Sequence, residues 1–158
     1  MRAFVVFVLL GSFFWSSCLK KSSGCSYEAD MIAAPVSQQQ LVKKYLDSAG
    51  ITQAILDSNG FYYQIVAQGI GASPQPCSQV TVQYKGTLIN GAVFDQENNA
   101  VYTLGSLIDG WREGLPLIKI GGEIKLYLPP ALGYGSSENP SIPANSILIF
   151  DIFLLNVQ

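Results

Sequence analysis

The sequence predicts an α+β domain in which one antiparallel β-sheet wraps around a single short α-helix, with an additional helix before the sheet. Two observations carry this prediction. Strand-like alternation of apolar and polar residues occurs on both sides of one short helical pattern at residues 107–115. An apolar period of three to four residues at positions 38–49 precedes all of these strands. No internal repeat divides the chain further, so we expect one folded domain.

The chain begins like an exported protein. Arg2 precedes an apolar run at residues 3–15, which is shorter than the roughly 20 residues that a membrane-spanning helix needs. Residues 1–17 are therefore interpreted as a signal peptide. Two serines before Cys18 resemble the bacterial lipoprotein signal, in which the cysteine carries lipid, although Trp15 departs from the usual aliphatic residue. This predicts a membrane-anchored lipoprotein on the periplasmic or outer-membrane face, and a conventional cleaved signal is the alternative.

A lipidated polar tether is expected at residues 18–35. Its Cys25 and the later Cys77 form an even pair in an exported chain, where disulfides are permitted. A Cys25–Cys77 disulfide is therefore predicted. Two unpaired thiols are the alternative, because spacing along the chain says nothing about distance in the fold.

A short N-terminal helical extension is expected at residues 36–59, with its helix at residues 38–49. Ser37 is the expected N-cap, and Gly50 is the expected end. The apolar positions that share one face of this helix are Leu41, Val42, Tyr45, Leu46 and Ala49.

Strands are expected from residue 60 onward. Residues 61–68 are rich in aromatic and β-branched side chains, and residues 80–85 alternate between apolar and polar. The loop between them contains Gly69-Ile70-Gly71 without a third spaced glycine, so a dinucleotide-binding loop is rejected. Asn90-Gly91 between two apolar runs predicts a tight hairpin turn. A brief strand at residues 102–104 follows.

The second half of the domain centres on the predicted helix at 107–115. Its apolar face would carry Leu107, Ile108, Trp111 and Leu115. Residues 123–128 alternate as a half-buried strand, and the Gly- and Pro-rich residues 131–144 form a loop. An almost continuous apolar run at 147–155 predicts the closing strand.

Composition excludes several classes of function. The chain has no histidine, a net charge of −2 and only 13% charged residues. Without histidine, Ser-His-Asp and Cys-His catalysis and His-bearing zinc sites are impossible. The low and slightly negative charge lacks the basic footprint of a nucleic-acid-binding protein. Any chemistry must therefore proceed without imidazole.

A series of short motifs follows in one order and spacing along residues 60–158. They are Val82-Gln83-Tyr84-Lys85-Gly86-Thr87-Leu88, Asn90-Gly91, Val93-Phe94-Asp95, Ile108-Asp109-Gly110-Trp111, Leu132-Gly133-Tyr134-Gly135, Ile142-Pro143-Ala144-Asn145 and Leu148-Ile149-Phe150-Asp151-Ile152. In this order they resemble the FK506-binding-protein (FKBP) family of peptidyl-prolyl isomerases. The resemblance implies an FKBP-type isomerase domain at residues 60–158.

The resemblance also implies a hydrophobic pocket with Trp111 as its floor. The backbone N–H of Ile108 and the hydroxyl of Tyr134 would donate hydrogen bonds to ligand carbonyls, and Asp95 would make a polar contact at the pocket edge. Periodicity alone would instead assign the aromatic residues to the core and Asp95 to a turn. The pocket residues implied are Tyr84, Phe94, Asp95, Tyr102, Leu107, Ile108, Trp111, Tyr134, Ile142 and Phe150.

Two positions depart from the family pattern. Ala100 stands where many members have an aromatic wall residue, and Asn139 stands where some have histidine. The pocket is therefore expected to be more open on that side.

The function implied is cis–trans isomerisation of X-Pro bonds in exported proteins, with no cofactor and no metal. Partners would be proline-containing peptides or unfolded proteins, FK506- or rapamycin-type ligands, and a membrane through the lipid anchor, with no nucleic acid. A non-enzymatic scaffold lipoprotein with the same fold is the alternative. Such a pocket suits the composition, because rotation about an amide needs no acid, nucleophile or metal.

Overall fold

The computed structural model describes residues 27, 32–138 and 140–158. The predicted signal peptide, Cys18, Cys25 and Asn139 lie outside these residues. The helices and strands are α1 (Val36–Ser48), β1 (Ile55–Leu56), β2 (Tyr62–Ala67), β3 (Gln79–Leu88), β4 (Val93–Thr103), α2 (Asp109–Gly114), β5 (Glu123–Leu128) and β6 (Leu148–Val157). Short 3-10 turns are η1 (Leu104–Ser106), η2 (Leu115–Leu117) and η3 (Pro130–Leu132).

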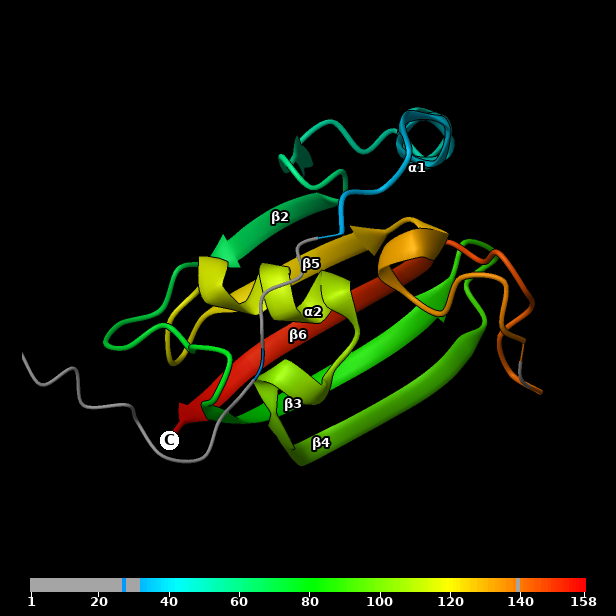
Figure 1. The fold of residues 1–158 in the computed structure, drawn as a ribbon. Coiled ribbons are helices and arrows are strands. Elements are labelled where there is room, and N and C mark those ends of the chain that lie inside the picture. Colours follow the sequence, from blue (N-terminus) through cyan, green and yellow to red (C-terminus); the bar gives the residue numbers. More distant parts are fainter. Residues whose placement is uncertain (1–26, 28–31, 139) are drawn as a thin grey trace, which may run out of the picture.

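The strands of the described residues form one antiparallel sheet in the order β1-β2-β5-β6-β3-β4 (Figure 1). The C-terminal strand β6 lies between β5 and β3, so the end of the chain completes the middle of the sheet. The predicted α+β architecture, a sheet around one short helix with an extra N-terminal helix, is confirmed.

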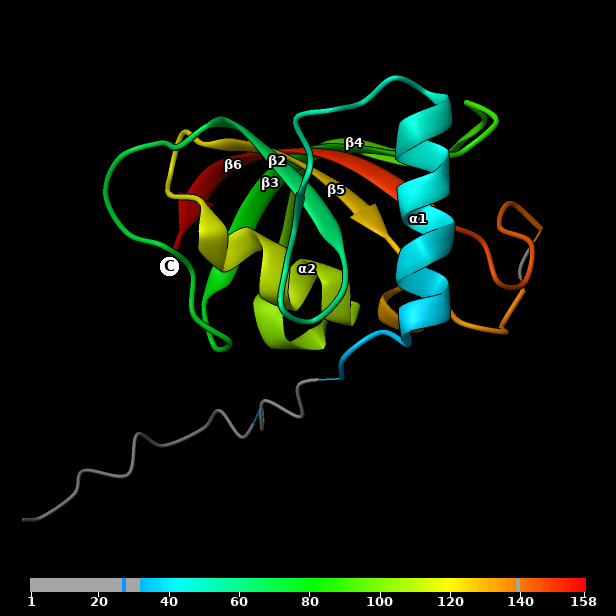
Figure 2. The ribbon, with the colours of Figure 1, turned by 90° about the horizontal axis from the view of Figure 1, so that it is seen from above.

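The two helices pack on opposite faces of this sheet. On β5, Ile124, Leu126 and Leu128 belong to the main core together with Trp111 of α2. Tyr127 points the other way, as strand alternation requires, and packs with Val42 of α1 in a second, smaller core. Figure 2 shows the sheet curling over α2, with α1 across the end toward which β5 points. The face that covers α2 is called the inner face below.

The helix α2 lies close to β5 because it carries two glycines toward that strand. A Cβ at Gly110 would come within 2.4 Å of the Leu128 side chain, and one at Gly114 within 2.7 Å of Leu126. Packed interiors do not tolerate such contacts, so any larger residue would push the helix away from the sheet. The close approach sets how deeply Trp111, next to Gly110, enters the core.

The β3–β4 hairpin turns at Asn90-Gly91 as predicted. The N–H of Leu88 donates to the carbonyl of Ala92 at 2.9 Å, and Gly91 has a φ of 85°, which glycine adopts without strain. The strand β4 then continues unbroken to Thr103. The separate strand predicted at residues 102–104 is wrong, because Tyr102 and Thr103 end β4 and Leu104 begins η1.

The helix α1 begins two residues earlier than predicted. Pro35 is its N-cap with a φ of −54°, and no described side chain caps this end, so the predicted cap at Ser37 is wrong. Proline suits the position because its ring fixes φ and it has no N–H to satisfy. The other end is confirmed: Ala49 is the C-cap and Gly50 follows in the left-handed region with a φ of 68°.

The predicted helix at 107–115 is shorter in the structure. Leu107 and Ile108 have extended backbones with ψ of 170° and 151°, so α2 starts only at Asp109. At the other end the helix tightens into η2, where Pro116 stands. Neither α1 nor α2, the α-helices of the described residues, is long and apolar enough to cross a bilayer.

The edge strand β1 was not predicted. It has two residues, Ile55 and Leu56, which pair with Tyr63 and Tyr62. Both are exposed, so they lack the buried-and-exposed alternation that indicates a strand in a sequence. The helical extension predicted at residues 36–59 therefore contains a strand as well as a helix.

Candidate active site

Trp111 lies at the centre of an aromatic cluster on the inner face. Its ring centroid is 5.1 Å from that of Tyr84, 5.2 Å from Phe150 and 6.5 Å from Tyr102, each in an edge-to-face arrangement. Phe94 extends the cluster by packing edge-to-face on Phe150 at 5.4 Å. Such arrangements are favourable for aromatic quadrupoles and hold the rings in fixed orientations. The side chains come from α2 and from β3, β4 and β6.

A glycine in β3 makes room for this packing. A Cβ at Gly86 would lie 2.5 Å from the Phe94 ring and 3.0 Å from the Phe150 ring. Sequence reasoning did not assign Gly86 a role, although a glycine inside a strand pattern is a signal for close packing. The wall formed by Phe94 and Phe150 therefore depends on this position.

The hydroxyls of Tyr84 and Tyr102 lie between the aromatic cluster and the carboxylate of Asp95 at its edge. The Tyr84 hydroxyl donates to Oδ2 of Asp95 at 2.6 Å and lies 3.4 Å from the Tyr102 hydroxyl. Irregularities in the β3–β4 pairing on either side of Tyr84 and Gly86 change the local register. Burial, followed by the hydrogen bond to Asp95, raises the pKa of Tyr84 far above its usual value. Tyr84 therefore stays protonated and holds the Asp95 carboxylate in place.

Three hydrogen-bond donors at the site have no partner among the described residues, and one of them is the buried Nε1–H of Trp111. The N–H of Ile108 precedes the first turn of α2, where backbone donors lack helical acceptors. The Tyr134 hydroxyl belongs to a side chain that is 43% exposed. Burial, followed by the charges of Asp95 and Tyr102, raises the pKa of Tyr134, so this hydroxyl also remains a donor. The Ile108 N–H and the Tyr134 hydroxyl can each donate to a ligand carbonyl without breaking an existing bond.

The structure places eight of the ten sequence-predicted site residues, all except Asp95 and Tyr134, in or against the main core. Tyr84 holds Asp95, and Tyr134 lies within electrostatic reach of Asp95 and Tyr102. Ala100 is buried in the same core with 7% exposure, and the more open pocket expected beside it stays a prediction. The functional roles of these residues remain predictions.

The arrangement suits binding of an apolar group with carbonyls beside it. Its surfaces are aromatic and aliphatic, and Asp95 is the one carboxylate among its ten residues. No group of three or more histidine, cysteine, aspartate or glutamate residues that could hold a metal occurs among the described residues. The side chains present can therefore desolvate and orient an apolar group.

Comparison with known proteins agrees with this geometry. The family model for FKBP-type peptidyl-prolyl cis-trans isomerases matches residues 71–155. The chain is 38% identical over 144 residues to the FKBP-type peptidyl-prolyl cis-trans isomerase FkpA of Escherichia coli K12, covering 89% of this chain and 52% of that protein. It is 41% identical over 106 residues to the isomerase Mip of Coxiella burnetii, covering 64% of this chain and 46% of that protein. The chain belongs to the FKBP-type peptidyl-prolyl cis-trans isomerase family.

Solved structures support the same assignment. The crystal structure of FkpA from Escherichia coli matches with a TM-score of 0.70 and 40% identity, covering 78% of this chain and 60% of that one. A peptidyl-prolyl isomerase from Pseudomonas syringae matches with a TM-score of 0.68 and 25% identity, covering 79% and 97%. The chain thus spans about half the length of the curated relatives it matches.

Proposed function

We propose that this protein catalyses cis–trans isomerisation of X-Pro bonds in exported polypeptides. The observation that carries the proposal is the aromatic cluster around Trp111, which has three donors without a described partner: Trp111 Nε1–H, Ile108 N–H and the Tyr134 hydroxyl. Membership of the isomerase family and the names of FkpA and Mip support it.

The chemistry follows from the barrier to be lowered. An X-Pro bond resists rotation by about 18–20 kcal/mol because twisting removes amide resonance. An aromatic site takes water away from the carbonyl, which weakens the solvation that favours the charge-separated planar amide. The donors Ile108 N–H and Tyr134 hydroxyl fix the carbonyls on either side of the rotating bond. Catalysis requires only that the twisted form is held more tightly than either planar form.

The site of action follows from the N-terminal sequence. Residues 1–17 are proposed as a signal peptide and Cys18 as the lipidated first residue of the mature protein. Several acyl chains, at about 0.8 kcal/mol per buried CH₂, would anchor the protein firmly to a membrane. The clients would then be exported proteins whose slow X-Pro bonds limit folding. Intact-mass analysis of membrane-extracted protein tests this, because any unmodified N-terminus contradicts lipidation of Cys18.

The test of the activity is a protease-coupled assay on an X-Pro tetrapeptide. We expect the rate to rise above the spontaneous rate in proportion to protein concentration, and FK506 to inhibit it. Tryptophan emission is recorded in parallel, because Trp111 is the only tryptophan outside the predicted signal peptide. A ligand-induced change in emission without catalysis would overturn the enzyme proposal and establish the scaffold alternative.

A further inference from the structure

An apolar groove lies outside the candidate active site, between α1 and the tip of the β3–β4 hairpin. It has a volume of about 650 Å³. Its third wall is the segment that leads into β6, residues 143–147. The apolar residues that line it are Leu41, Tyr45, Leu88, Ile89, Pro143 and Ile147.

One wall of the groove is apolar because α1 leaves part of its apolar surface exposed to solvent. Val42 and Leu46 of α1 are almost fully buried against the sheet. Leu41, the residue before Val42, is 53% exposed. Across the groove, Ile89 at the hairpin tip is also 53% exposed. Exposed apolar side chains that face one another across a depression mark an interaction site more often than scattered ones do.

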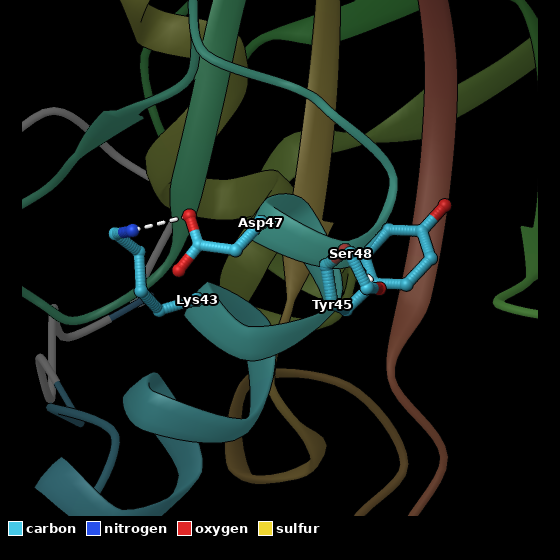
Figure 3. A network of polar contacts seen from close by, with 4 residues as sticks. All are labelled: Lys43, Tyr45, Asp47 and Ser48. Carbon is cyan, nitrogen blue, oxygen red and sulfur yellow. Dashed lines mark hydrogen bonds and ion pairs between the residues drawn. The ribbon is translucent and has the colours of Figure 1, made fainter.

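The charge at the groove is of one sign. Lys44 is its only charged lining residue and forms no ion pair with any described residue. Its neighbour Lys43 is bound to Asp47 at 2.5 Å, and Figure 3 shows this pair on the side of α1 away from the Tyr45 ring. Lys43 is therefore paired with a carboxylate away from the groove, whereas Lys44 brings a positive charge without an ion pair to the groove.

The groove is also next to the candidate active site along the chain. Ile142 is buried in the main core with the aromatic cluster, and the following residue, Pro143, lines the groove. An extended polypeptide advances about 3.3 Å per residue. A few residues of a bound chain can therefore lead from the part of the site beside Ile142 to the groove beside Pro143.

We propose that this groove binds an extended polypeptide segment that carries apolar side chains and an acidic residue, with Lys44 receiving the carboxylate. The groove supplies apolar contacts to alternate side chains and one positive charge. One part of this proposal rests on the proposed function. It is that the segment belongs to the client whose proline occupies the Trp111 site.

Two proline-free peptides test the proposal with the full-length protein. Both are fluorescently labelled and rich in leucine and phenylalanine, and they differ only in one central residue, aspartate or lysine. We expect the aspartate peptide to bind about two- to five-fold more tightly, the range for a partly exposed ion pair. Lys44→Gln should abolish this preference and Lys44→Glu should reverse it. The matched control, Lys43→Gln, removes an equal charge one residue away and should leave the preference intact.

A second variant tests the apolar contacts. Leu41→Glu should weaken both peptides at least ten-fold while leaving the unfolding midpoint close to wild type, because Leu41 is largely exposed. Equal binding of the two peptides, or unchanged binding by Leu41→Glu, would overturn the proposal. A concentration-dependent dimer that Leu41→Glu dissolves would assign the groove to a second copy of the chain and also overturn it. Tetrapeptide isomerisation is measured in the same samples, so loss of groove binding is distinguished from loss of the enzyme activity.

Discussion

The Tyr84–Asp95 hydrogen bond is the polar contact that ties the aromatic cluster to its edge. Its donor–acceptor distance of 2.6 Å is that of a bond to a charged acceptor. Tyr84→Phe should lower the free energy of unfolding by about 1–2 kcal/mol, near the low end for such bonds because the exposed Asp95 regains water. Tyr102→Phe is the matched control, because its hydroxyl is 3.4 Å from that of Tyr84. Urea unfolding in which both variants lose equal stability would contradict this role.

Glu113 of α2 links stability to pH away from the candidate active site. Its Oε2 is buried, and no described residue donates to it. Burial is the largest cause that raises the pKa of Glu113 above its ordinary value of 4.5, and the charges of Asp57 and Asp109 add to it, while Asn59 and Arg112 oppose it. The folded state therefore holds this proton to higher pH than the unfolded state does.

The sign of the effect follows from that difference. As the pH rises above 4.5, the unfolded chain loses the Glu113 proton first, so this residue lowers stability progressively until the folded pKa has been passed. Glu113→Gln should therefore be more stable than wild type at neutral pH, with a difference that shrinks on acidification toward pH 4. Urea unfolding at several pH values measures this, with Glu138→Gln in the exposed loop as the control. A difference independent of pH would contradict the explanation.

At the scale of elements, the close packing of α2 on β5 favours glycine at a helix position where helix propensity favours alanine. Replacing a helical glycine by alanine normally gains about 1 kcal/mol. At Gly110 the new Cβ would lie 2.4 Å from Leu128, and overpacking costs about 1–3 kcal/mol. We therefore expect Gly110→Ala to destabilise the protein and to change Trp111 emission.

A double-mutant cycle separates the two effects. In a Leu128→Ala background the clash is removed, so Gly110→Ala should become neutral or stabilising relative to that background. Thermal unfolding of the four proteins gives the coupling energy. An equal penalty in both backgrounds would show that the close contact between α2 and β5 is not the cause.

The sequence predicted elements whose signals are local. Alternation along residues 123–128 matches β5, and Asn90-Gly91 predicted the hairpin because a tight turn needs a left-handed residue, which Gly91 supplies with a φ of 85°. The strand β1 was missed because two exposed residues carry no burial pattern. The start of α2 was misplaced because Leu107 and Ile108 fit a helical period but are held extended by the turn before it.

The candidate site depends on contacts that no local pattern encodes. Periodicity would assign Phe94, Tyr102 and Phe150 to the core, and they do pack against or within it. Tyr84, Tyr102 and Phe150 meet around Trp111 because the sheet curls over α2 and brings β3, β4 and β6 to one ring, while Phe94 packs on Phe150. The family resemblance supplied this grouping. It did not supply the Tyr84–Asp95 bond, which depends on the register of β3 against β4.

At the scale of the whole molecule, the bonding state of Cys77 bears on the predicted pairing. Cys77 is disulfide-bonded, and Cys25, the predicted partner, lies outside the described residues. The adjoining Pro76 and Ser78 accept hydrogen bonds from η1, and the Tyr27 ring packs against Gly105 of the same turn. Tyr27 therefore lies beside η1.

The predicted Cys25–Cys77 pairing has a measurable consequence. Closing a loop of about 50 residues stabilises by about 4 kcal/mol in the chain-entropy model, so Cys25→Ser should lower the unfolding temperature substantially. Peptide mapping under non-reducing conditions should recover the two cysteines in one cross-linked fragment. Full alkylation of Cys25 without reduction would contradict the pairing.

The central claim is that X-Pro isomerisation occurs at the aromatic cluster around Trp111. Exchange NMR on an X-Pro tetrapeptide, with a sub-stoichiometric amount of protein, measures the cis–trans rate without a coupling protease. We expect exchange far above the spontaneous rate with wild type, and a loss of at least ten-fold with Phe94→Ala or Asp95→Ala in samples shown to be folded. Ile70→Ala, at a side chain that is 87% exposed and belongs to neither core, should retain the wild-type rate. Spontaneous-rate exchange with folded wild-type protein, or full activity in both site variants, would contradict the claim.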